Sequence, residues 1–189
     1  MNNGFTDVHL VFLDRDGVLN RKAPEGDYVV TWEQFEFLPD APQAIAKLNR
    51  AGLKVVVVTN QRGVALGRMS EATLKSIHDR MERELTLHNA HVDGVFYCPH
   101  DGDACECRKP KPGLLFQAFE HFPEVPSANA ILIGDSLPDI QAGRDAGLRT
   151  IFVRGPSKTR KQGFAEAEQK ADAVASSLAD AVTRLLRLA

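Results

Sequence analysis

The chain of 189 residues is 43% hydrophobic and 25% charged, proportions that are typical of globular proteins and argue against disordered and fibrous classes. Its net charge of −2 argues against a general binder of nucleic acid or membrane surfaces, so neither is expected as a partner. The length fits one domain over 1–189, and with no signal-peptide pattern and no membrane-spanning run we expect a cytoplasmic monomer.

Short apolar runs of strand length alternate with amphipathic segments along the chain. In chain order, the strand-like runs are VHLVFL (8–13), KVVVVT (54–59), GVFYC (94–98), AILIGD (130–135) and RTIFVR (149–154). Helical patterns occupy 40–52, 70–85, 113–121, 137–146 and 178–188. This alternation predicts an α/β, Rossmann-like three-layer sandwich, in which helices cover both faces of a central parallel sheet.

Polar residues mark where several of these helices begin. Asp40 stands at a predicted N-cap position, Ser70 with Glu71 begins the next helix, and Ser177-x-x-Asp180 is a capping-box pattern. In the helix that follows Ser70, His78 falls between the core positions, and the sequence indicates no role for it.

Two connections, 21–32 and 98–112, are longer than the neighbouring elements require, which makes them candidates for function. The remaining intervals between strands are filled by the predicted helices, so the fold is expected to lack a separate cap domain. The segment 155–171 is expected to be a polar surface segment, helical in part, and carries no recognisable chemistry.

Polar residues at the ends of the predicted strands are the main functional signal. Asp14 and Asp16 follow the first strand in LDRDG, and Asp135 follows the fourth in GDSLPD, with Asp139 one helical turn beyond. Because ligands bind outside the carboxyl ends of parallel strands, these carboxylates are predicted to meet at one edge of the sheet. Side chains alternate along a strand, so Arg15 is expected to turn aside. Such a cluster of hard oxygens suits Mg²⁺.

A carboxylate pair with Mg²⁺ is typical of phosphoryl transfer. One aspartate attacks phosphorus to form an aspartyl-phosphate, and the other protonates the leaving oxygen and then activates water. Thr59, the backbone amides after it and Lys109 are placed to stabilise the transferring group. Singly, these residues have ordinary explanations as turn, cap or solvated residues, but their occurrence at successive strand ends favours an active site.

FLDRDGVLN, VVTNQRG, RKPKPG and LIGDSLPD resemble the four motifs of the haloacid dehalogenase-like phosphatases. Together with the CPH and CEC sequences ahead of RKP, they resemble the branch that contains heptose-1,7-bisphosphate phosphatases and histidinol-phosphatases, over nearly all of 8–154. The resemblance implies Asp14 as nucleophile and Asp16 as general acid/base. It also implies that Thr59 and Lys109 stabilise the phosphoryl group. The implied Mg²⁺ ligands are Asp14, the backbone carbonyl of Asp16, and Asp135.

All three cysteines lie within ten residues, together with a histidine, in CPHDGDACEC. The four candidate ligands are Cys98, His100, Cys105 and Cys107. Three thiolates and one imidazole complete a tetrahedral Zn²⁺ site without an open position, so the zinc is predicted to be structural. Buried free thiols and redox chemistry are weaker alternatives, because the cysteines cluster and lack the C-x-x-C spacing. The zinc would hold loop 98–109 as a substrate clamp, with Arg108 on a phosphate or sugar oxygen.

Substrate contacts are expected from the two long loops and the strand ends. The candidates are Glu25, Gly26, Asp27, Tyr28, Asn60, Gln61, Arg62, Arg108, Lys109 and Ser136. A second phosphate would find Arg62, Arg108 or Arg68, although for Arg68 a solvated surface position is the favoured interpretation. The Tyr28 loop, FEFLP and TNQRGVALG favour the heptose group, which implies removal of the 7-phosphate of D-glycero-D-manno-heptose 1,7-bisphosphate. Histidinol phosphate or another small phosphate ester is the alternative. Arg62 stands where a serine is common in the heptose group, and Ser136 where a basic residue is common.

Overall fold

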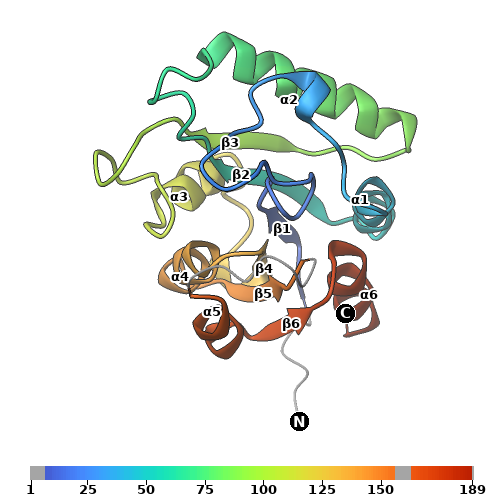
Figure 1. Cartoon of the computed structure of the whole chain (residues 1–189). Helices are drawn as coiled ribbons and strands as arrows, with labels where there is room; N and C mark the ends of the chain where they lie inside the picture. The colour runs from blue at the N-terminus through green and yellow to red at the C-terminus, as the bar shows by residue number, and fades with distance from the viewer. Residues whose placement is uncertain (1–6, 156–162, 189) are drawn as a thin grey trace.

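The computed structural model describes residues 7–155 and 163–188, and this part of the chain contains a parallel sheet of six strands in the order β3-β2-β1-β4-β5-β6 (Figure 1). The strands are β1 (Leu10–Leu13), β2 (Lys54–Asn60), β3 (Gly94–Cys98), β4 (Ala130–Gly134), β5 (Arg149–Val153) and β6 (Ala173–Ala175). All five predicted strands are present. Strand β6 was not predicted, because its three residues lack the long β-branched or aromatic run that marks the others.

Helices cover both faces of the sheet, which confirms the predicted three-layer α/β sandwich. They are α1 (Ala41–Arg50), α2 (Glu71–Leu87), α3 (Gly113–Phe119), α4 (Leu137–Asp145), α5 (Phe164–Lys170) and α6 (Leu178–Leu188), with 3-10 turns η1 (Trp32–Gln34) and η2 (Ser127–Asn129). Helices α1, α2 and α6 pack on one face, and α3, α4 and α5 pack on the other (Figure 1). Helix α5 falls within the polar segment 155–171, of which 156–162 lie outside the described residues.

Strand β1 shows how the sheet separates two cores. Its four residues are fully buried: Val11 and Leu13 join the cluster under α1, α2 and α6, whereas Leu10 and Phe12 join the cluster under α3 and α4. Because alternate side chains face opposite sides, a parallel strand covered on both faces is an unbroken apolar run. The run ends at Asp14, which therefore lies at the carboxyl edge of the sheet.

The predicted helix caps are only partly as expected. Ser70 caps α2, since its hydroxyl accepts a hydrogen bond from the Thr73 amide at 3.0 Å. Asp40 occupies the N-cap position of α1 but makes no side-chain cap bond, because its backbone is in the left-handed region at φ 63°. At α6, Ser177 Oγ accepts a hydrogen bond from the Asp180 amide at 3.1 Å. The Asp180 carboxylate accepts from the amide and hydroxyl of Ser176, not from the Ser177 amide, so the capping box is incomplete. In the described residues, no helix has the length and apolar character needed to span a membrane.

Candidate active site

The predicted site residues meet where three adjacent strands end, at the carboxyl edge of the sheet. Thr59 lies near the end of β2, Asp14 directly follows β1, and Asp135 directly follows β4. Carboxylate oxygens of Asp14, Asp135 and Asp139 lie within 4.8 Å of one another. The strand order therefore brings together residues that are more than 120 positions apart in the sequence, as the sheet-edge rule predicts.

Lys109 is buried within this cluster. Its ammonium group lies 2.9 Å from Asp14 Oδ1 and 2.5 Å from Asp139 Oδ1, and it donates to the Val58 carbonyl at 2.8 Å. Burial alone would lower the pKa of Lys109, but the charges of Asp139 and Asp14 outweigh burial and raise the pKa, so the lysine stays charged. Asn60 fixes its backbone, donating to the Lys109 carbonyl at 2.9 Å and accepting from the Lys109 amide at 3.1 Å.

The ionised form of Asp14 is disfavoured by its surroundings. Its side chain is buried, and its pKa is raised to about 7, chiefly by burial and then by the charge of Asp139, while Lys109 opposes the rise. A divalent cation between Asp14 and Asp135 would neutralise this charge. The donor set therefore fits Mg²⁺, which prefers carboxylate oxygens and completes its shell with water and substrate.

We expect Mg²⁺ binding to weaken as the pH falls below about 7. A protonated carboxyl does not bind the ion, so the affinity is full above the pKa of Asp14 and falls by up to about tenfold per pH unit below it. Calorimetric titrations of Mg²⁺ between about pH 5.5 and 8.5 measure this dependence. An affinity that stays constant down to the lower pH would contradict both the ligand role of Asp14 and its raised pKa.

Asp16 is held by four hydrogen bonds. Its carboxylate accepts from Arg15 Nη2 at 2.9 and 3.0 Å, from Asn20 Nδ2 at 2.9 Å, and from Gln61 Nε2 at 2.9 Å. Burial would raise the pKa of Asp16, but the charge of Arg15 and these bonds outweigh burial and lower it. The expectation that Arg15 turns aside is wrong. The strand has already ended, Gly17 turns the chain at φ 100°, and strand alternation no longer applies.

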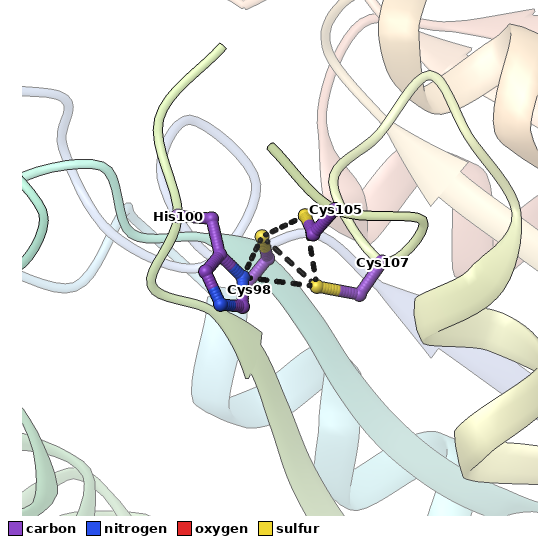
Figure 2. Close-up of side chains that lie close together, drawn as sticks. All are labelled: Cys98, His100, Cys105 and Cys107. Atoms are coloured by element: carbon purple, nitrogen blue, oxygen red, sulfur yellow. Dashed lines mark hydrogen bonds between the residues drawn. The ribbon is translucent and has the colours of Figure 1, made fainter. Parts of the chain in front are cut away.

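The four predicted zinc ligands converge just beyond β3 (Figure 2). The sulfur atom of Cys107 lies 3.2 Å from those of both Cys98 and Cys105, which are 3.5 Å apart. His100 Nδ1 lies 3.4 Å from Cys107 Sγ and 3.6 Å from Cys98 Sγ. Burial and the neighbouring sulfurs raise the pKa of Cys107, so a thiolate there requires a cation. Three sulfurs and one imidazole nitrogen at these separations fit a closed tetrahedral Zn²⁺ site.

Two arginines predicted as substrate contacts bond to the zinc loop. Arg62 pairs with Asp101 through contacts of 2.5 and 3.0 Å. Arg108 Nη1 donates to the His100 carbonyl at 3.2 Å. The guanidinium of Arg62 is thus neutralised by a carboxylate, which does not support its predicted contact with a second phosphate. Arg108 remains half-buried, next in sequence to Lys109.

The loop 21–32 borders a cavity of about 590 Å³. Asp27 and Tyr28 line it, as does Arg68, whereas the predicted contacts Glu25 and Gly26 are exposed. Lys22 also lines this cavity, and its ammonium group lies 2.6 Å from Asp135 Oδ1. Lys22, to which no role was predicted, thus links a wall of this cavity to one of the carboxylates.

Ser136 and Asp139 form a capping box at the start of α4. The Asp139 carboxylate accepts from the Ser136 amide at 3.1 Å and from its hydroxyl. Ser136 is thereby engaged in holding the carboxylate that pairs with Lys109, a role the sequence analysis missed. The Ser-x-x-Asp spacing in GDSLPD is the signal that could have identified it.

Comparisons with known proteins show the family of this chain. A HAD-hydrolase-like family model matches residues 106–181. The chain is 38% identical over 182 residues to D-glycero-beta-D-manno-heptose-1,7-bisphosphate 7-phosphatase of Salmonella typhi, covering 92% of this chain and 93% of the relative. The chain belongs to the heptose-1,7-bisphosphate 7-phosphatase family.

Other members of the heptose-1,7-bisphosphate 7-phosphatase family match as well. The alpha-anomer enzyme of Mycobacterium bovis is 43% identical over 132 residues, 69% of each chain. The crystal structure of the D,D-heptose 1,7-bisphosphate phosphatase from B. bronchiseptica, complexed with magnesium and phosphate, superimposes with a TM-score of 0.83 at 35% identity. The superposition covers 96% of this chain and 100% of the B. bronchiseptica chain.

Proposed function

We propose that this protein is a Mg²⁺-dependent phosphatase that removes the 7-phosphate of D-glycero-D-manno-heptose 1,7-bisphosphate. The carrying observation is the meeting of Asp14, Asp135 and Lys109 at the carboxyl edge of the sheet, in a chain related over almost its whole length to 7-phosphatases. The cavity bordered by loop 21–32 would accommodate the sugar, and Arg68, which lines it, offers a cation to a second phosphate, whereas Lys22 is already paired with Asp135.

In the first half of the reaction, an Asp14 carboxylate oxygen attacks the phosphorus and the bond from phosphorus to the 7-oxygen breaks. The phosphate dianion raises the pKa of Asp16, which then carries the proton that passes to the leaving oxygen. Lys109 and the Thr59 hydroxyl donate to the phosphoryl oxygens. Bound Mg²⁺, held by Asp14, Asp135 and the Asp16 carbonyl, supplies further positive charge for these oxygens.

In the second half, water attacks the phosphorus of the aspartyl-phosphate. The water proton passes to Asp16, the bond between phosphorus and the Asp14 oxygen breaks, and inorganic phosphate leaves. Gln61 donates to both Asp16 and Thr59, each at 2.9 Å. These bonds fix the position of the acid/base carboxylate relative to the hydroxyl that donates to the phosphoryl group. The zinc-binding loop positions Lys109, which lies two residues beyond Cys107.

The substrate assignment predicts a strong preference for one anomer of the heptose bisphosphate. We expect kcat/KM for that anomer to exceed that for histidinol phosphate by at least about 10²-fold, because a substrate without a second phosphate forms no ion pair with the cations that line the cavity. Phosphate release from the alpha anomer, the beta anomer and histidinol phosphate, with Mg²⁺ at matched concentrations, measures this. A preference for histidinol phosphate would refute the substrate while leaving the mechanism intact.

A further inference from the structure

A buried arginine and a buried histidine form a contact that the reaction above does not use. Arg15 is fully buried, and its Nη1 lies 3.1 Å from Nε2 of His78 on helix α2, although the two residues are 63 positions apart. Through Nη2, the same guanidinium holds both carboxylate oxygens of Asp16. Cζ of the Arg15 guanidinium lies 6.0 Å from the centroid of the Phe35 ring. The acid/base carboxylate is thus linked to α2 through one side chain.

The chemistry of the two groups determines the state of His78. A guanidinium only donates hydrogen bonds, so Nε2 must accept and must therefore carry no proton. Burial, and after it the charge of Arg15, lowers the pKa of His78 to about 3, which keeps the ring neutral at all working pH values. His78 is thus a neutral acceptor at a fixed position, 5% exposed on a helix that is capped and packed into the core.

We propose that His78 is a positioning residue for the acid/base carboxylate: it anchors the Arg15 guanidinium, which in turn orients Asp16. This inference rests on the proposed function, because it takes Asp16 as the group that protonates the leaving oxygen. Among the residues that the structure describes, Nε of Arg15 has no hydrogen-bond partner. Loss of the acceptor at His78 would leave Nη1 buried and unpaired as well, so the guanidinium would turn to find another acceptor. Its two contacts with Asp16 would then be lost.

Two variants of similar size separate positioning from packing. His78→Gln keeps an oxygen that can accept from Arg15, whereas His78→Met fills the same space with a poor acceptor. Ile77→Val is the matched control, since it trims a neighbouring core residue of α2. For each variant, KM and the single-turnover rate of aspartyl-phosphate formation are measured with heptose bisphosphate, which has a poor leaving group, and with p-nitrophenyl phosphate, which needs no protonation.

For His78→Met, we expect an about tenfold slower single-turnover rate with heptose bisphosphate, at unchanged KM, and at most an about twofold change with p-nitrophenyl phosphate. His78→Gln should restore the rate to within about threefold of the wild type. Equal losses on both substrates, or a His78→Met rate like that of Ile77→Val, would overturn the positioning role. Asp16→Asn is measured in parallel. If it shows no dependence on the leaving group, the acid role proposed for Asp16 fails first.

Discussion

Asp14→Asn is expected to lower turnover by roughly 10⁴-fold or more, because an amide neither attacks phosphorus nor binds Mg²⁺ as a carboxylate does. The same substitution should leave the protein without Mg²⁺ at least as stable as the wild type near neutral pH. The pKa of Asp14 is raised to about 7, so its ionised form is disfavoured by the fold, and a neutral amide avoids that cost. Loss of activity together with retained stability is the signature of a residue selected for chemistry rather than for folding.

The experiment compares phosphate release, zinc content and thermal unfolding of Asp14→Asn with those of the wild type. Asp79→Asn is the matched control, because it makes the same chemical change at a carboxylate on the exposed side of α2, paired with Lys75. We expect the control to retain wild-type turnover. Retention of appreciable turnover by Asp14→Asn, in a preparation free of contaminating phosphatase, would refute its assignment as the nucleophile.

The strand ends could be predicted from sequence because they depend on local patterns. An apolar run that ends in DRDG or GDSLPD locates both the strand and the polar residue after it, and the parallel-sheet rule then brings Asp14 and Asp135 together. The cysteine spacing is equally local, because the four ligands lie within ten residues of one another in the sequence. In both cases the residues that must meet are either close in sequence or joined by a general property of parallel sheets.

Contacts that depend on the packing of particular side chains could not be predicted in this way. His78 lies on the buried side of α2, and nothing in the helical pattern indicates that an arginine 63 positions earlier meets it. Lys22 pairs with Asp135 only because the 21–32 loop folds over the carboxyl edge of the sheet. Arg62 is a further case, because its pairing with Asp101 of the zinc loop could not be predicted from the sequence, and its substrate contact stays a prediction.

Cys107→Ser is expected to remove zinc and stability together. A hydroxyl is a poor replacement for a thiolate ligand, and the free energy of binding a structural zinc is part of the free energy of folding. We expect a loss of about 3 kcal/mol or more, which corresponds to a decrease in Tm of about 10 °C for a chain of this length. Metal analysis and thermal unfolding measure the two effects on the same preparation.

The catalytic consequence of Cys107→Ser follows from the position of Lys109. The lysine is two residues beyond the last zinc ligand, and Asn60 bonds to its backbone amide and carbonyl from the other side. A loosened loop should therefore raise KM and slow turnover, even at temperatures where the mutant protein is folded. Ala104→Ser is the matched control, because it places a hydroxyl at an exposed, non-ligand position of the same loop. A Cys107→Ser protein that lacked zinc but retained wild-type KM and hydrogen-exchange protection over 98–109 would show that the metal does not position the lysine.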